Sequence, residues 1–263
     1  YPVFATVAAR DRREAVAGLA ALAAGRSAPG VVGPHAGSCR AGTVFVYSGQ
    51  GSQWPGMGRQ LLADEPAFAA AVAELEPVFV EVAGFSLQRV LAGGESVAGI
   101  ERIQPVLVGV QLALTALWRS YGIEPDAVIG HSMGEVSAAV VAGALSPRDG
   151  LRVITTLSGS AADSGAPDVL AALADLTPRR PVIPVVTAGC ATPDFDAEHW
   201  AADRPNLVQV TDAVAAAGAE HGTFVEVSPH PLLTDAISDT LADVHHHSLG
   251  TLARDTHDTL TFH

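Results

Sequence analysis

The chain has 263 residues, with 15 arginines and no lysine against 28 acidic residues, and a formal net charge of −13. Hydrophobic residues make up 48% and charged residues 16%, so disorder driven by charge is excluded and a full apolar core is expected. The acidic balance argues against a nucleic-acid binder. The lack of lysine excludes a lysine Schiff base and a P-loop lysine.

The two cysteines, Cys39 and Cys190, lie far apart and form no C-x-x-C pair, which supports neither a disulfide framework nor a thiolate zinc site. We therefore expect a reducing, cytoplasmic location. The longest purely apolar stretches are shorter than the roughly 18 residues of a membrane span. The start, Tyr1–Phe4, has no signal-peptide features, and we interpret the chain as a segment of a longer polypeptide.

Short apolar strands alternate with helices along the chain, which predicts an α/β domain with a largely parallel sheet. Apolar residues spaced by three and four predict helices over residues 11–25, around 61–62, 67–82, 104–121, from 132 to about 144, 147–156 and 168–176. Runs of β-branched and aromatic residues predict strands at 43–47, 127–130, 181–186 and 224–227. The Gly/Ser/Pro-rich stretch that follows the helix 11–25 and runs through Arg40, and the ten small and polar residues 158–167, are typical of connectors.

The most informative motif is Gly130-His131-Ser132-Met133-Gly134, a G-x-S-x-G between a predicted strand and a predicted helix. The glycines permit a sharp turn that presents the Ser132 hydroxyl at a helix N-terminus, where the N–H of Met133 can face a developing oxyanion. This setting indicates a nucleophilic serine. The alternative is a glycine-tolerant turn with a capping serine.

A second glycine turn, Gly49-Gln50-Gly51, follows the first predicted strand of the sheet. Parallel sheets gather their sites at the carboxyl ends of their strands, so this turn can supply a second backbone N–H near Ser132. Alone, it would be interpreted as an ordinary glycine loop.

Together these motifs resemble the acyltransferase domain of modular type I polyketide synthases, and more widely the malonyl-CoA:acyl-carrier-protein transacylases. The resemblance covers four ordered boxes, at residues 45–58, 102–107, 118–152 and 226–233. The flanks, including 250–255, resemble the linkers of mycobacterial-type lipid synthases. The resemblance implies an α/β-hydrolase-like core, a role in lipid biosynthesis, and neighbouring ketosynthase and other synthase domains.

The resemblance also implies site residues. It implies that Ser132 is the nucleophile, that the backbone N–H groups of Gln50 and Met133 bind the oxyanion, and that Gln104 and His131 lie in the substrate pocket. Malonyl-CoA or methylmalonyl-CoA would esterify the serine, and the phosphopantetheine thiol of an acyl carrier protein would then take the acyl group. The residues around Gln104 and Met133 resemble those of family members that take a methyl-branched extender unit. No metal and no tightly bound cofactor are implied.

The chain departs from the family after the helix 147–156, where the family has an arginine for the malonyl carboxylate and this chain has Leu157. The ferredoxin-like small subdomain with its base histidine is expected to be absent and replaced by the short connector. We therefore divide the chain into a preceding linker (1–41), a large subdomain in two parts (42–157 and 168–243) joined by the connector (158–167), and a following linker (244–263).

Loss of the base predicts severely impaired transfer, because a serine hydroxyl is a weak nucleophile without one. His230 is a candidate substitute base, which would make the chain a serine esterase or thioesterase; a non-catalytic structural segment of the synthase is the third interpretation. We interpret His245–His247 as a solvated run and not as a metal site. Docking of an acidic carrier domain would need local arginines, with Arg59, Arg179 and Arg180 as candidates.

Overall fold

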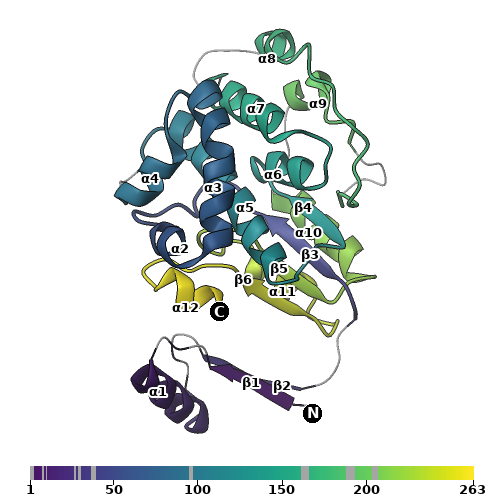
Figure 1. The fold of residues 1–263 in the computed structure, drawn as a ribbon. Helices are drawn as coiled ribbons and strands as arrows, with labels where there is room; N and C mark the ends of the chain where they lie inside the picture. Colours follow the sequence, from purple (N-terminus) through teal and green to yellow (C-terminus); the bar gives the residue numbers. More distant parts are fainter. Residues whose placement is uncertain are drawn as a thin grey trace.

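A four-stranded sheet in the order β4-β3-β5-β6 forms the centre of this computed structural model (Figure 1). The strands are β3 (Thr43–Tyr47), β4 (Ala127–Gly130), β5 (Thr223–Glu226) and β6 (His247–Gly250). All three pairings are parallel, which confirms the α/β class with a parallel sheet. The structure describes residues 3–7, 9, 11–26, 28, 31–36, 40–94, 97–160, 166–187, 193–202 and 207–263.

Helices cover both faces of this sheet (Figure 1). In chain order they are α2 (Arg59–Asp64), α3 (Pro66–Val78), the π-helical turn η1 (Phe79–Ala83), α4 (Leu87–Gly93), α5 (Ile100–Ser120), α6 (Gly134–Val141), α7 (Pro147–Ser160), α8 (Ala166–Ala172), α9 (Ala197–Ala201), α10 (Leu207–Gly218), α11 (Thr234–Thr240) and α12 (Asp258–Phe262). The predicted helices of the first half are thereby confirmed, with ends that differ by a few residues.

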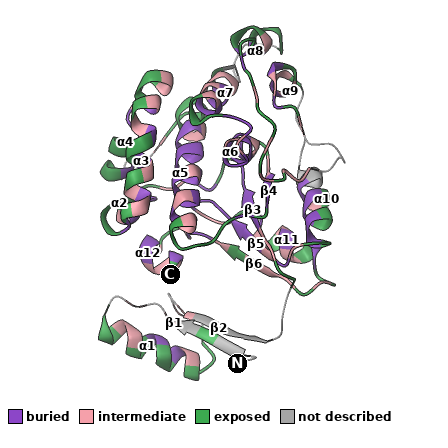
Figure 2. Ribbon diagram, turned by 45° about the vertical axis from the view of Figure 1, so that its right-hand side comes forward, coloured by how far each residue is buried: buried purple, intermediate pink, exposed green. Residues whose placement is uncertain are grey.

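The side chains of β3 point alternately to the two faces of the sheet, so they belong to two separate cores. Phe45 and Tyr47 belong to the core under α3, α5, α6 and α7. Val44 and Val46 belong to the core under α10 and α11. All four side chains are 0% exposed, and each contributes about 1.5–3 kcal/mol by burial. Figure 2 shows the same pattern, with buried residues on β3, β4 and β5 and on the inner sides of the helices.

The central helix of the first core, α5, also holds the end of β3 through buried polar side chains. Gln111 donates from Nε2 to the carbonyl of Ser48 at 2.8 Å and accepts from the hydroxyl of Ser137 on α6. Thr115, one turn later, bonds the hydroxyl of Tyr47 at 2.9 Å. These contacts fix the carboxyl end of β3 relative to α6.

By length and mean hydropathy α5 alone would qualify as a membrane span among the described helices, although we predicted no such stretch. Of its most apolar window, 61% is buried inside the structure. The apolar residues of α5 are accounted for by the core.

The second half corrects three sequence predictions. Residues 181–186 form no strand, and only Val185 makes an isolated bridge, with Val128 of β4. The two prolines in this stretch remove backbone donors, which prevents a regular ladder. The connector is shorter than predicted, since α7 continues to Ser160 and α8 begins at Ala166; residues 161–165 lie outside the described part. The predicted helix 168–176 is α8, which ends at Ala172.

The two terminal segments contain the predicted helix 11–25 and further elements that we did not predict. Within 1–41, β1 (Val3–Val7) pairs antiparallel with β2 (Val31–Ala36), and α1 (Arg12–Ala23) connects them. Within 244–263, β6 extends the main sheet and α12 packs against α2 and the end of α5 (Figure 1). The ring of Phe262 lies 4.7 Å from that of Trp118. Short edge elements of this kind carry too few periodic residues to be recognised in sequence.

The last residue of β5, Glu226, organises the loop that follows it. Its side chain is 0% exposed and accepts hydrogen bonds from the backbone N–H groups of Leu232, Leu233 and Thr234 at 2.7–3.2 Å, and from the hydroxyl of Ser228. One buried carboxylate therefore fixes the loop 228–234 beside β3 and β6.

We expect Glu226→Gln to lower the free energy of unfolding by about 2–3 kcal/mol, because an amide offers one acceptor oxygen and turns its NH₂ group toward backbone donors. Urea denaturation measures this loss. The matched control is Glu220→Gln on an exposed position, which should change stability by less than about 0.5 kcal/mol. Equal losses in the two variants would contradict the role assigned to Glu226.

The first residue of α12, Asp258, carries a buried carboxyl group that is 1% exposed. Burial raises its pKa to about 6, while the nearby backbone N–H groups of Gln60 and Gly58 and the charge of Arg59 act in the opposite direction. A raised carboxyl pKa means that the folded state binds more protons than the unfolded state between about pH 4 and 6. This group therefore costs stability as the pH rises through that window.

We expect Asp258→Asn to stabilise the protein by about 1–3 kcal/mol at pH 7.5 and to have little effect near pH 3, where the carboxyl group is mostly protonated in both states. Denaturation at the two pH values tests this, with the exposed Asp243→Asn as control. A variant that is less stable than the parent at pH 7.5, or an effect of equal size at both pH values, would contradict it.

Candidate active site

The turn between β4 and α6 presents Ser132 in a left-handed backbone conformation, with φ 54°. The preceding residue, His131, donates its N–H to the carbonyl of Tyr47 at 2.9 Å, which continues the β3–β4 ladder to the start of the turn. The chain then reverses, and the side chain of Ser132 is exposed. The non-glycine residue at positive φ is costly in general, and the sheet and helix on its two sides hold it.

Both glycines of the motif are required by contacts on the opposite side of the turn. A Cβ at Gly130 would lie 2.4 Å from the Cα of Glu135, and a Cβ at Gly134 would lie 2.1 Å from the carbonyl oxygen of Tyr47. These distances are far inside van der Waals contact, so no other residue fits without displacing backbone. The motif therefore packs α6 directly onto β3.

The N–H groups of the two predicted oxyanion residues are unengaged. Within the part of the chain that the structure describes, neither Gln50 nor Met133 donates a backbone hydrogen bond, whereas Gly134 and Glu135 donate to the carbonyls of His131 and Ser132 at 2.9 and 3.0 Å. The turn after β3 lies close, since a Cβ at Gly49 would be 3.4 Å from that of Ser132. Two free donors thus flank the serine.

A cavity of about 170 Å³ adjoins the serine. Ser132, Met133 and Gln104 line it together, so the structure brings these three predicted residues to one place. Leu157, the residue at which the sequence departs from the family, lines it as well. The remaining lining residues are Ile100, Glu135, Val136, Ile154 and Trp200.

The fifth predicted residue, His131, is half-buried at the turn itself. Desolvation lowers the pKa of its imidazole, and the nearby carboxylate of Glu135 partly opposes this effect. The ring is therefore neutral at pH 7 and can donate a hydrogen bond without carrying charge.

The hydroxyl of Ser132 has no hydrogen-bond partner among the described residues. His230, the candidate substitute base, lies on the loop after β5, and its Nδ1 accepts the backbone N–H of Arg254 at 3.1 Å. The neutral ring then carries its proton on Nε2, which leaves no free nitrogen to accept the serine proton. His230 does not line the described cavity, and its role as a base stays a prediction without geometric support.

Sequence reasoning missed Glu135 and the aromatic group on α9. The Nε2 atom of His199 lies 3.5 Å from Oε2 of Glu135, and the ring of Trp200 packs against Phe195 and His199. Trp200 is 3% exposed and forms one wall of the cavity. Glu135 could have been found from its place directly after the glycine motif. The group on α9 could have been found from the ring-bearing residues His199 and Trp200, four and five positions after Phe195.

No group of three or more histidine, cysteine or acidic side chains suitable for a metal ion occurs among the described residues. His245 is exposed, while His246 and His247 are partly buried, and His247 begins β6. The Nδ1 atom of His246 faces the carbonyl of Val244 at 2.8 Å.

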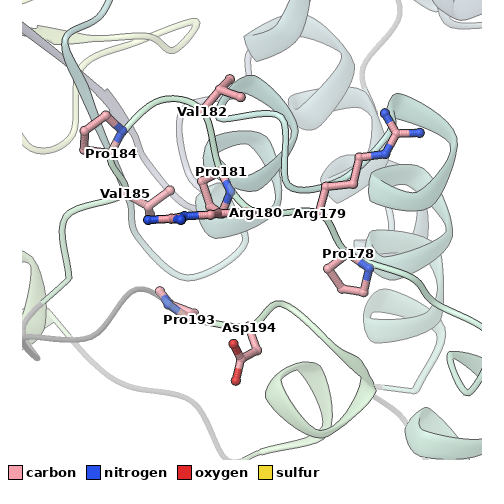
Figure 3. Close-up of a pocket in the computed structure, with 9 residues that line it drawn as sticks. All are labelled: Pro178, Arg179, Arg180, Pro181, Val182, Pro184, Val185, Pro193 and Asp194. Atoms are coloured by element: carbon pink, nitrogen blue, oxygen red, sulfur yellow. The ribbon is translucent and has the colours of Figure 1, made fainter.

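A separate surface hollow lies at the prolines that follow α8, lined among others by Arg179, Arg180 and Asp194 (Figure 3). Both arginines are exposed, and Figure 3 shows that their guanidinium groups point in different directions. No ion pair to either is present among the described residues. The third predicted docking residue, Arg59, is exposed at the start of α2.

Comparison with known protein families identifies the family of this chain. The model of the acyl transferase domain matches residues 44–192 and 160–263. The chain belongs to the acyl transferase domain family. The family assignment predicted from the motifs is thus confirmed, and the chain is a transferase domain of the polyketide synthase type.

Sequence and structural relatives support this type. A phenolphthiocerol/phthiocerol polyketide synthase of Mycobacterium tuberculosis is 50% identical over 348 residues, with 99% of this chain and 16% of that protein covered. The chain therefore spans about a sixth of that relative. The solved acyltransferase domain of the polyketide synthase PpsC of Mycobacterium tuberculosis is 47% identical with a TM-score of 0.79, over 91% of this chain and 98% of that one. The acyltransferase domain of module 8 of the salinomycin polyketide synthase is 30% identical with a TM-score of 0.85, over 98% and 82% of the two chains.

We expect Gly134→Ala to destabilise the domain by about 3 kcal/mol or more, because the added methyl group collides with a strand carbonyl that cannot move. Thermal denaturation measures the loss. Gly159→Ala is the matched control, since this exposed helical glycine has nothing within 4 Å of its added Cβ, and should gain up to about 1 kcal/mol. If the Gly134 variant melted like the parent, the close packing of α6 on β3 would be disproved.

Proposed function

We propose that this chain is the large subdomain of a polyketide synthase acyltransferase that carries an acyl group on Ser132 between coenzyme A and an acyl carrier protein. The observation that carries the proposal is the serine at a strained strand-to-helix turn with two unengaged N–H groups beside it. The nucleophile role of Ser132, the oxyanion roles of Gln50 and Met133, and the pocket roles of Gln104 and His131 are part of this proposal.

The reaction has two transfer steps with the same geometry. In the first, the oxygen of Ser132 adds to the thioester carbonyl, the N–H groups of Gln50 and Met133 stabilise the oxyanion, and the C–S bond breaks while the serine proton leaves with coenzyme A as a thiol. In the second, the phosphopantetheine thiol of the carrier protein attacks the acyl-serine ester and the proton returns to the serine. The chain's own residues supply the nucleophile and the oxyanion donors.

We propose that transfer of malonyl or methylmalonyl units is severely impaired in this chain. Ser132 lacks a hydrogen-bonded base among the described residues, and Leu157 stands where the family's carboxylate-binding arginine is expected. Loss of one member of a catalytic triad costs on the order of 10⁴–10⁶ in rate.

The small subdomain that carries the base in the family is proposed to be missing between the two parts of this chain. The alignment with the phenolphthiocerol/phthiocerol polyketide synthase extends over 348 residues whereas this chain has 263, so at least 85 aligned positions have no residue here. The two segments matched by the family model overlap at residues 160–192, a range that includes part of the predicted connector.

The partners follow from the same proposal. The carrier protein, the ketosynthase and the other synthase domains would lie on the same or an associated polypeptide in the cytoplasm, and lipid biosynthesis would be the process served. Arg59, Arg179 and Arg180 are the proposed docking cations for an acidic carrier domain, because they are exposed.

Incubation with malonyl-CoA or methylmalonyl-CoA followed by intact-protein mass spectrometry tests the acyl-serine step. We expect a slow mass increase of one acyl group that disappears in Ser132→Ala and persists in Ser238→Ala, a serine outside the cavity. We expect the rate to be at least about 10⁴ below that of an intact acyltransferase domain. Labelling that survives in Ser132→Ala would disprove the nucleophile, and transfer at the rate of an intact domain would disprove the impairment.

A further inference from the structure

We infer that the cavity beside Ser132 selects a short, uncharged acyl group, such as acetyl or propionyl, over a dicarboxylic one such as malonyl. The inference rests on the proposed acyl-serine step and adds the substrate class for this chain. The acyl group enters as its coenzyme A thioester, and the bonds made and broken are those of the first step above.

The walls of the cavity carry the inference. Three apolar side chains, Ile154, Leu157 and Trp200, face the space next to the serine. Ile154 is 0% exposed and Trp200 is 3% exposed, so this side of the cavity is closed by the core and by α9. An acyl chain placed here would exchange water for apolar contacts.

The polar groups that line the cavity do not suit a second carboxylate. The charged lining residue is Glu135, whose sign is the same as that of a malonyl carboxylate. Gln104 offers one neutral amide, and the pKa of the nearby His131 imidazole is lowered, which keeps that ring neutral. A carboxylate would therefore lose water without gaining a positive partner, and burial of an unpaired charge is strongly unfavourable.

The nearest arginines along the chain are engaged elsewhere. Arg102, two residues before Gln104, lies over the ring of Phe85 at 4.9 Å. Arg152, five residues before Leu157, pairs with Asp175 and Asp149 on the outer side of α7. Neither lines the cavity in the described part of the chain.

The size of the cavity sets the length of the acyl group. Its volume is about 170 Å³, and an apolar protein cavity of about 150 Å³ holds a benzene molecule. An acetyl or propionyl group therefore fits within this volume, whereas a long fatty acyl chain would extend beyond it.

Acylation of the full chain by acetyl-CoA, propionyl-CoA, malonyl-CoA and methylmalonyl-CoA at equal concentrations tests the inference by intact-protein mass spectrometry. We expect acetyl or propionyl labelling of Ser132 to be faster than malonyl or methylmalonyl labelling by on the order of 100-fold. Leu157→Arg should reduce or reverse this ratio, because it adds a cation to the wall. Leu157→Gln adds polarity without charge and should leave the preference in place. Equal or faster labelling by the dicarboxylic thioesters in the parent chain overturns the inference.

A binding measurement separates this inference from the proposed function. Calorimetry with Ser132→Ala and the non-transferable analogues of acetyl-CoA and malonyl-CoA, in which methylene replaces the thioester sulfur, reports selectivity without acyl transfer. Tighter binding of the acetyl analogue by tenfold or more supports the inference even if the parent serine is never acylated, a result that would defeat the proposed transfer alone. Equal affinities, tighter binding of the malonyl analogue, or no binding of either overturn the inference.

Discussion

The site depends on the direct contact between the N-terminus of α6 and the end of β3. A Cβ at Gly134 would lie 2.1 Å from the carbonyl oxygen of Tyr47, so the helix can approach the strand only where a side chain is absent. This approach gives the helix its direction and leaves Ser132, two residues earlier, at positive φ with its hydroxyl outside the turn. The strain at the serine is offset by the buried strands on one side and the buried helix on the other.

Buried polar side chains fix the loops at the carboxyl ends of β3 and β5. Gln111 of α5 bonds the carbonyl of Ser48 and the hydroxyl of Ser137, which links the turn after β3 to α6. Glu226 does the same for the loop after β5 by accepting three backbone N–H groups. The polar side-chain atoms of both residues are hydrogen-bonded, and a polar network of this kind fixes one geometry where apolar contacts alone would permit several. The turns that carry Gln50 and Met133 are therefore positioned by residues that do not line the cavity.

The sequence predicted the parts of this arrangement that depend on local pattern. Strand β3, in which every residue after Thr43 is buried, can be recognised from its run of apolar residues. The turn at Ser132 can be recognised because its two glycines lie within two residues of the serine. The prediction of a strand at 181–186 was wrong because the prolines in this stretch limit its pairing with β4 to the bridge at Val185. Whether such a stretch forms a strand depends on its pairing with a neighbouring strand, which β-propensity alone does not predict.

The composition of the cavity was only partly visible in sequence. Gln104 and Met133 came from the motif resemblance, while Trp200 reaches the serine from a helix far along the chain, through packing against Phe195 and His199. Contacts of this kind depend on how α9 lies over α6, which no local period encodes. The same holds for β6, whose four residues become a strand because β5 offers an open edge.

The elements that build the serine turn and those that would activate the serine are separate in this chain. The glycines pack α6 onto β3, and β3, α5 and α6 contribute to the buried core, so this geometry does not require a base or a carboxylate-binding cation, neither of which lies beside the hydroxyl among the described residues. The selectivity that we propose can then change independently of the proposed nucleophile, since Leu157 lies on α7 and only borders the cavity. In the proposed reaction, a substitution at position 157 can place a positive charge on that wall of the cavity, whereas Ser132 is held by its own turn and by the contact of α6 with β3.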